Sequence, residues 1–414
     1  MDSLSMFLLI LLACLGLGLL FREGVFKKPW LAVLCAILMA AAIALRASVF
    51  DRQTGDYMDF LARWVGYYRA NGGFRAFAQY PPYCNYHVPY LYFLALFSYL
   101  PASDLALIKL LSCLFDLILA WAVMRIISRV SANSYLRLAA FFAVLFWPTV
   151  ILNGALWGQC DSIYVAFAML AVLLALEDKP IGSMICWACS FAFKLQAVFL
   201  LPIAVILWIY RKYRWQHFLV FPLAYLLLIL PAVLLGRPLG ETVFFYLSQT
   251  GSIGDGLNYN SPSVFAFFWN LPAEQQENAA RIGILASVLV LGNLLAVAWI
   301  KRKELSDRSV LCLSVLMAIL VPFLLPHMHD RYFFGADILS LILAFAMPPF
   351  FLAAPLVDFA SFLGYYAYLS FYFSERGGHY LIQMKYGAMA LLLASFLSAL
   401  AFVLSLRRKT SRKR

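Results

Sequence analysis

Residues 51–104 begin with DRQTGDYMDFLARW and continue, at 79–101, with QYPPYCNYHVPYLYFLALFSYLP. Long apolar runs lie on both sides, so this stretch is a polar and aromatic loop attached to a membrane at both ends. Within it Asp56 follows Gly55, and the apolar residues after Asp56 recur at helical spacing. The pattern predicts an amphipathic helix at the membrane surface, with a carboxylate at its first turn. We expect the remainder of the chain to hold this loop.

Composition places the remainder of the chain in a membrane. Of 414 residues, 64% are hydrophobic and 13% are charged, whereas an ordinary soluble domain has about a quarter of its residues charged. The apolar runs are continuous rather than alternating, which predicts an all-α integral membrane protein and not a barrel. The net charge of +12 comes from short basic clusters between apolar runs, a pattern typical of cytoplasmic loops. No nucleic-acid partner is therefore expected.

A span of about 20 apolar residues crosses a bilayer, and the chain contains about thirteen such stretches in a single polytopic domain, 1–414. They are 3–21, 29–49, 105–127, 136–154, 160–177, 181–194, 195–210, 217–235, 281–300, 309–326, 332–352, 354–373 and 384–406. The run 86–100 is too short for a comfortable crossing, and we expect it to dip into the outer interface. Every later basic loop then lies in the cytoplasm. This assignment makes 51–104 one extracytoplasmic unit with two juxtamembrane helices, and 236–280 a second large outer loop.

Polar residues at a membrane boundary are costly, which makes each of them a candidate for function. Seven charged or imidazole side chains are predicted to face the outer side together. They are Asp56, Asp161, Lys194, His327, His329, Asp330 and Arg331. Carboxylates and cations at one interface suit the transfer of a group from a phosphate-linked donor. The carboxylate takes the proton of the acceptor, and the cations stabilise the departing phosphate.

Several of these residues also have a structural interpretation. Asp56 is either a base or a cap of the surface helix. Asp59 lies four residues before Arg63, which favours an ion pair along the helix over a catalytic role. Lys194 lies inside a long apolar run and needs a partner, which is either a donor phosphate or Asp161.

Two short polar motifs refine these candidates. HMHDRY at 327–332 combines two imidazoles with a guanidinium, which indicates a phosphate site around Arg331 or, alternatively, an interfacial anchor. Two further ligands for zinc are not evident, so no metal is expected. WGQCDS at 157–162 places Gln159 and Asp161 at a helix start, either as an N-terminal cap turn or as part of a substrate pocket.

Four motifs together resemble the GT-C class of glycosyltransferases, which span the membrane many times and use polyprenyl-phosphate sugars. TGDYMDFLARW is similar to the G-D-[FY]-x-x start of the dolichyl-phosphate-glucose-dependent glucosyltransferases. YPPYCNYH, from Tyr80 to His87, is similar to their YPP-x-x-x-Y-H turn. HMHDRYF resembles their H-x-H-E-[KR] motif, with Asp330 in place of the usual Glu. WGQCDS is like the WGQ-x-D-S turn of bacterial mannosyl- and glucosyltransferases of this class.

The resemblance implies a fold and a set of roles. The first outer loop of the class carries a catalytic acid and two juxtamembrane helices, which agrees with the prediction for 51–104. By resemblance Asp56 is the catalytic base, and Arg331 and His329 contact the donor phosphate or sugar. The chain departs from the class in an additional N-terminal span and at Asp330.

We therefore expect an inverting enzyme that moves one hexose from a polyprenyl-phosphate donor to an acceptor hydroxyl on the extracytoplasmic or lumenal side. Lys194 and His327 would join the donor site, the acceptor would be a glycan, a lipid or a protein, and no cofactor is expected. Two other functions stay open, a glycan polymerase or ligase using a lipid-linked chain and a transporter of lipid-linked sugars. Compact loops favour a bacterial plasma membrane over the endoplasmic reticulum.

Overall fold

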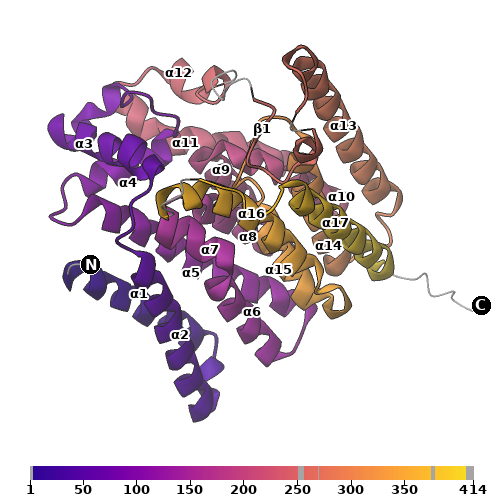
Figure 1. Cartoon of the computed structure of the whole chain (residues 1–414). Helices are drawn as coiled ribbons and strands as arrows, with labels where there is room; N and C mark the ends of the chain where they lie inside the picture. The colour runs from indigo at the N-terminus through magenta and orange to yellow at the C-terminus, as the bar shows by residue number, and fades with distance from the viewer. Residues whose placement is uncertain (1–2, 250–255, 269, 374–377, 407–414) are drawn as a thin grey trace, which may run out of the picture.

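The computed structural model describes residues 3–249, 256–268, 270–373 and 378–406, and it is almost entirely helical (Figure 1). Eight helical segments in these ranges are long and apolar enough to cross a membrane. They contain α1 (Ser3–Arg22), α2 (Pro29–Val49), α5 (Asp104–Val130), α11 (Val220–Leu234), α13 (Ala273–Ile300), α14 (Asp307–Leu324), α16 (Ala353–Phe373) and α17 (Lys385–Ser405). The chain is an all-α multispanning membrane protein, as its composition predicts.

The other predicted spans coincide with broken or short helices. α6 (Ser134–Phe146) is followed, after a bend of 47°, by α7 (Pro148–Ile151) and a π-helical turn η4 (Leu152–Trp157), and counting this pair as one span gives nine. The remaining four are shorter apolar helices. They are α8 (Asp161–Leu176), α9 (Pro180–Phe193), α10 (Pro202–Ile209) with the turn η5 (Leu195–Phe199) before it, and α15 (Phe334–Ala346). Of the thirteen predicted spans, eight or nine thus have the length of a complete crossing.

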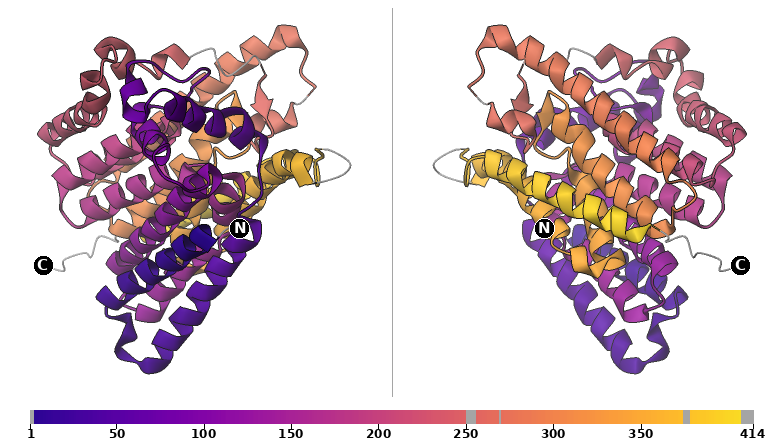
Figure 2. Two further views of the ribbon diagram at one scale, coloured as in Figure 1. Left: turned by 90° about the vertical axis from the view of Figure 1, so that its left-hand side faces the viewer. Right: turned by 90° about the vertical axis from the view of Figure 1, so that its right-hand side faces the viewer.

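The helices at the centre of the bundle differ in burial from those at its edge. In α5 and α14, 78% of the most apolar window is buried inside the molecule. The α1–α2 hairpin and α13 lie on the outside of the bundle (Figures 1 and 2), and their windows are only 17–28% buried. Each of these outer helices contains a long window that is apolar on all sides, so the exposed faces of these windows suit contact with lipid.

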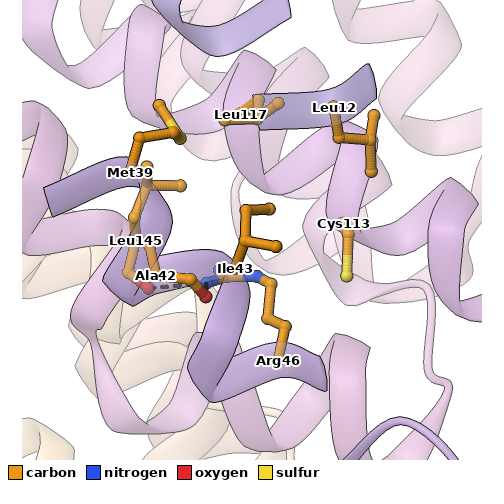
Figure 3. Close-up of a pocket in the computed structure, with 8 residues that line it drawn as sticks. All are labelled: Leu12, Met39, Ala42, Ile43, Arg46, Cys113, Leu117 and Leu145. Carbon is orange, nitrogen blue, oxygen red and sulfur yellow. Dashed lines mark hydrogen bonds between the residues drawn. The ribbon is translucent and has the colours of Figure 1, made fainter. Parts of the chain in front are cut away.

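A buried ion pair joins the peripheral α2 to the central α5. Arg46 Nη2 donates to Asp116 Oδ2 at 2.9 Å, and Nη1 donates to the carbonyl of Leu145 at 2.9 Å. Beside it a cavity of about 10 Å³ lies between α1, α2, α5 and α6 (Figure 3). The lining is apolar apart from Arg46 and Cys113, and the space is barely that of one water molecule. This seam is therefore packed rather than open to a ligand.

The C-terminus of α2 is fixed where the first outer loop begins. Lys109 Nζ donates to the carbonyls of Phe50 and Arg52 at 2.8 and 2.7 Å. A cation at a helix C-terminus satisfies free carbonyls and interacts favourably with the helix dipole. Thr54 Oγ1 then donates to the carbonyl of Trp157 at 3.2 Å. These contacts determine how the loop enters the site.

The 51–104 loop contains two helices, at the positions that the sequence predicts. α3 (Ala62–Ala70) is preceded by a π-helical turn, η2 (Tyr57–Leu61), and α4 (Val88–Phe97) follows the proline-rich turn. Ten residues of α helix extend about 15 Å, half of the hydrocarbon thickness of a bilayer, so α4 is too short to cross by itself. That both helices lie at the bilayer surface stays a prediction.

Three segments far apart in the sequence meet at one end of the bundle. In the 236–280 loop β1 (Asn258–Tyr259) pairs in parallel with β2 (Met328–His329), which connects α14 to α15. Figure 1 shows α3, α4, α12 (Leu239–Val243) and β1 at this same end. The predicted polar motifs are therefore brought together here.

Candidate functional site

The carboxylate of Asp56 is held by three hydrogen-bond donors. Trp157 Nε1 and Gln159 Nε2 donate to Oδ2 at 3.0 and 2.5 Å, and the hydroxyl of Tyr368 donates to Oδ1 at 2.9 Å. The side chain makes no capping bond to the turn η2 that follows it, and 23% of it is exposed. Asp56 is therefore not a helix cap but a fixed carboxylate that is partly accessible.

Arg331 faces the same carboxylate. Its Nη1 lies 3.9 Å from Asp56 Oδ2 and 3.4 Å from Asp330 Oδ1, and its Nε lies 3.8 Å from Asp161 Oδ2. Within the described chain Nε has no hydrogen-bond partner. Burial acts to lower the pKa of Arg331, but the surrounding carboxylates outweigh it and raise the pKa well above the usual value. The guanidinium thus stays charged while part of its hydrogen-bonding capacity is unused.

Asp161 is a buried counter-ion behind Arg331. Only 1% of its side chain is exposed, Oδ1 accepts from Lys194 Nζ at 2.6 Å, and Oδ2 accepts from Asn153 Nδ2 at 2.7 Å. Asn153 Nδ2 also donates to the hydroxyl of Tyr365 at 2.8 Å. Lys194 therefore pairs with Asp161, the second of the two partners that the sequence left open. The pair agrees with the rule that charges buried in membrane proteins are matched.

One fully buried indole, that of Trp157, contacts several of these groups. Its ring stacks on Tyr368 with centroids 4.2 Å apart and planes 12° apart, and it meets Tyr365 edge-on at 5.5 Å. The guanidinium of Arg331 lies 5.1 Å from the ring centroid, within the range of a cation–π contact. Because Trp157 also donates to Asp56, this ring sets the relative positions of the carboxylate, the guanidinium and the tyrosine hydroxyl.

Local backbone geometry presents these side chains. Asp56 directly precedes the π-helical turn η2, and Trp157 ends the π-helical turn η4; such widened turns are frequent at functional sites. Gly158 has a φ of +79°, a conformation that favours glycine, and the chain reverses there into α8. A Cβ atom on Gly55 would collide with the hydroxyl of Tyr372 on α16. The two glycines thus permit the close approach of the first loop, η4 and α16.

The two histidines of the HMHDRY motif contact the 236–280 loop. His329 stacks on Tyr259 of β1, with ring centroids 4.7 Å apart. Burial, together with the charge of Arg331, lowers the pKa of His329 to about 4, so its imidazole is neutral at pH 7. His327 Nδ1 lies 2.8 Å from the carbonyl of Gly256. The motif is thus attached to the second loop.

Asp330 is the titratable group of the motif. It is 4% exposed, and burial raises its pKa to about 7, although Arg331 acts in the opposite direction. A carboxyl group that titrates near neutral pH therefore lies in contact with the guanidinium that faces Asp56. The described residues contain no group of three or more His, Cys, Asp or Glu side chains that could hold a metal ion.

Two predicted site residues, Tyr80 and His87, lie in a separate cluster. Nε2 of His87 is 2.8 Å from the carbonyl of Thr242. Tyr80 stacks on Phe245 at 4.8 Å, and the guanidinium of Arg237 lies 3.5 Å from the Tyr80 ring centroid. This cluster fastens the 51–104 loop to the 236–280 loop. The hydrogen bonds and ring contacts of the described chain do not join either side chain to the carboxylates of the site.

The sequence predicts the contact of the exposed acid Asp59, but it does not predict the part that the tyrosines of α16 play in the site. Asp59 pairs with Arg63 at 3.4 Å, as the spacing predicts. The contribution of α16 was missed. Tyr365, Tyr368 and Tyr372 lie at i, i+3 and i+7 and so share one helix face. Three hydroxyl groups at this spacing in an apolar helix were the signal that could have revealed them.

The central part of the chain matches a known protein family. The sequence model of glycosyltransferase family 87 matches residues 83–326, more than half of the chain. The chain belongs to glycosyltransferase family 87. With its helices it is a membrane glycosyltransferase, in agreement with the expected enzyme class. The family 87 match includes Gln159, Asp161 and Lys194 and lies between Asp56 and Arg331. Comparisons with curated proteins and with solved structures give no significant match.

Proposed function

We propose that this family 87 glycosyltransferase is an inverting enzyme of the GT-C type that moves one hexose from a polyprenyl-phosphate donor to an acceptor hydroxyl. The observation that carries the proposal is the pairing of a fixed carboxylate with a guanidinium, both of them partly accessible. Asp56 Oδ2 and Arg331 Nη1 lie 3.9 Å apart, and Arg331 Nε has no hydrogen-bond partner among the residues that the structure describes. A base beside an anion-binding group suits displacement at a carbon that is linked to phosphate.

In this reaction Asp56 takes the proton of the acceptor hydroxyl while the acceptor oxygen forms a bond to the anomeric carbon. The bond between that carbon and the phosphate oxygen breaks on the opposite face, and its electron pair leaves with the phosphate. Attack from the opposite face inverts the anomeric configuration. The leaving phosphate gains negative charge as the bond breaks, so Arg331 stabilises the transition state more than the bound donor.

The other charged groups keep Arg331 available. Asp161 is paired with Lys194 at 2.6 Å, and its other oxygen lies 3.8 Å from Arg331 Nε, which is longer than a hydrogen bond. An arginine held in this way can give two parallel hydrogen bonds to a phosphate. His329 is neutral at pH 7 and offers one ring N–H to a sugar hydroxyl or a phosphate oxygen. His327 supports it by fixing β2 to the second outer loop.

A donor with a polyprenyl chain would be bound at the membrane. The polyprenyl chain would stay in the bilayer beside the apolar helices, while its phosphate reaches the end of the bundle where the two outer loops meet. The basic clusters between the other spans favour the extracytoplasmic side for this end, and the compact loops favour a bacterial plasma membrane. The acceptor would approach from water and is a glycan, a lipid or a protein. No cofactor or metal is part of the proposal.

The test uses purified protein in detergent with synthetic short-chain polyprenyl-phosphate mannose and glucose. Release of polyprenyl phosphate is measured by mass spectrometry, so that slow transfer to water is detected even without the acceptor. Asp56→Asn is compared with Asp59→Asn, a matched control in the same loop that is exposed and paired with Arg63. We expect release from the wild type and from Asp59→Asn, and at least a hundredfold loss in a folded Asp56→Asn.

Other results would redirect the proposal. Equal release by the wild type and Asp56→Asn would remove Asp56 as the base. Transfer of whole lipid-linked chains would identify a polymerase or ligase. Movement of the lipid-linked sugar across a vesicle membrane, without release of polyprenyl phosphate, would identify a transporter.

A further inference from the structure

The two oxygens of the Asp56 carboxylate are not equivalent. Oδ2 accepts from Trp157 and Gln159, and it is the oxygen that Arg331 approaches. From the described residues Oδ1 accepts one hydrogen bond, donated by the Tyr368 hydroxyl at 2.9 Å. Each carboxylate oxygen has two lone pairs, so Oδ2 is saturated and Oδ1 retains one position for a further donor. An acceptor hydroxyl that approaches Asp56 therefore finds its place at Oδ1.

We propose that Oδ1 is the basic atom of Asp56 and that Tyr368 is a second catalytic residue, whose hydroxyl touches that atom and takes part in moving its proton. This inference rests on the proposed function of Asp56 as the base, and it extends that function to α16. It assigns a chemical role to a tyrosine at the outer end of a helix that otherwise packs in the bundle.

The position of the Tyr368 hydroxyl is determined from several sides. Its ring stacks on Trp157 at 4.2 Å, and the backbone N–H of Asp56 donates to its oxygen at 3.3 Å. The hydroxyl of Tyr372, one turn further along α16, donates to the same oxygen at 3.4 Å. The oxygen of Tyr368 thus accepts two hydrogen bonds, and its own proton is directed to Oδ1. In the resting enzyme the chain of donors runs from Tyr372 through Tyr368 to Asp56.

Reversal of this chain would return Asp56 to its ionised form after each transfer. The acceptor proton first forms a bond to Oδ1. The new Oδ1–H then donates to the oxygen of Tyr368, Tyr368 passes its own proton to the oxygen of Tyr372, and Tyr372 releases a proton to water. One proton enters at Oδ1 and one leaves at Tyr372, which is partly exposed, and neither tyrosine is changed.

The test compares three Tyr→Phe variants of α16 in the full-length enzyme. Tyr368→Phe keeps the ring that stacks on Trp157 and removes only the hydroxyl. We expect its kcat/KM at pH 7 to fall about tenfold or more. The acidic limb of its pH profile should move to higher pH by about one unit, because the ionised carboxylate has lost a donor. Tyr372→Phe should lower kcat severalfold without moving that limb.

Tyr366→Phe is the matched control, since the Tyr366 hydroxyl faces His379 at 3.0 Å and does not contact Asp56. It should keep the rate and the pH profile of the wild type. A Tyr368→Phe enzyme that folds, as judged by its melting temperature, and shows an unmoved acidic limb would overturn the inference, even if its rate is lower. If Asp56→Asn is inactive in the same assay, the proposed function survives that result. A wild type that releases no polyprenyl phosphate would overturn both.

Discussion

Arg46 and Arg331 both lie next to aspartates, but Arg46 is buried and Arg331 only partly so, and they use their hydrogen bonds differently. Arg46 is 2% exposed, and two of its nitrogens donate to Asp116 at 2.9 and 3.2 Å. Its third nitrogen donates to the carbonyls of Leu145 and Ala42. Arg331 is 18% exposed, its closest carboxylate oxygen is 3.4 Å away, and its Nε has no partner within the described chain.

This difference indicates that the charge of Arg46 is structural, whereas the charge of Arg331 is available to a ligand. All three nitrogens of Arg46 donate hydrogen bonds to described residues, and the cavity beside the guanidinium (Figure 3) has room for no more than about one water. Its partner Asp116 also accepts a hydrogen bond from Ser162, the residue after Asp161. The ion pair therefore helps to position the segment that carries Asp161. Arg331 is balanced by charge without being saturated by hydrogen bonds. A cation in that state can bind an anion without first breaking a strong internal pair.

The largest expected effect on stability comes from breaking the buried pair of Arg46 and Asp116. Arg46→Met leaves Asp116 buried without its cation, which we expect to lower the free energy of unfolding by about 3 kcal/mol. The measurement is thermal or chemical unfolding in detergent. The double variant Arg46→Met with Asp116→Leu removes both charges and should recover most of the loss. A single variant as stable as the wild type would show that the pair does not hold α2 to α5.

The next largest effect is expected from a change at Arg331, and it concerns activity rather than stability. Arg331→Lys keeps the charge but loses the planar pair of donors, so we expect kcat/KM for the polyprenyl-phosphate sugar to fall about a hundredfold. The melting temperature should stay within a few degrees of the wild type, because Arg331 makes no short ion pair that the change would break. An unchanged kcat/KM would remove Arg331 from the phosphate site.

A smaller effect comes from Asp330, whose pKa near 7 makes the charge around Arg331 depend on pH. Above pH 7 its ionised carboxylate competes with a donor phosphate, so the KM for the donor should rise about threefold to tenfold between pH 6 and pH 8.5. Asp330→Asn should abolish this rise while leaving the low-pH value unchanged. A KM that rises equally in both proteins would point to another titrating group.

The raised pKa of Asp330 also predicts the direction in which the free energy of unfolding changes with pH. Burial raises the pKa of Asp330 in the folded state above its value of 3.8 in an unfolded chain. Between about pH 4 and pH 7 the folded protein therefore binds more protons than the unfolded one, and the free energy of unfolding falls as the pH rises. Unfolding of Asp330→Asn should lack this component of the pH dependence.

Much of the fold follows from the one-dimensional pattern of the sequence. Apolar length locates each spanning helix, and the short run at 86–100 corresponds to the ten-residue α4. The i,i+4 spacing of Asp59 and Arg63 gives their ion pair, because neighbours on a helix need no tertiary information. The charged motifs likewise identify Asp56, Asp161 and Arg331 as members of one site.

The contacts between side chains within the site could not be predicted from the sequence pattern. The pairing of Asp56 with Tyr368 joins residues 312 positions apart, and it depends on how α16 packs against η4. Tyr80 and His87 belong to a motif that resembles a catalytic family, yet they contact the second outer loop instead. A motif shows which residues lie near each other in sequence, whereas the packing of helices decides which of them share a pocket.

The smallest expected effect concerns the exposed pair of Asp59 and Arg63. Their side chains are 61% and 70% exposed and meet at 3.4 Å, so water screens the attraction that is strong between Arg46 and Asp116. Asp59→Asn should change the free energy of unfolding by less than about 0.5 kcal/mol and the rate of donor turnover by less than about twofold. The measurements are detergent unfolding and release of polyprenyl phosphate, side by side with Asp56→Asn. Asp56 and Asp59 are three residues apart on the same loop, so a large loss in both variants would mean that the loop, rather than one carboxylate, is sensitive to charge. A loss confined to Asp56→Asn would attribute the effect to the carboxylate that Trp157, Gln159 and Tyr368 hold beside Arg331.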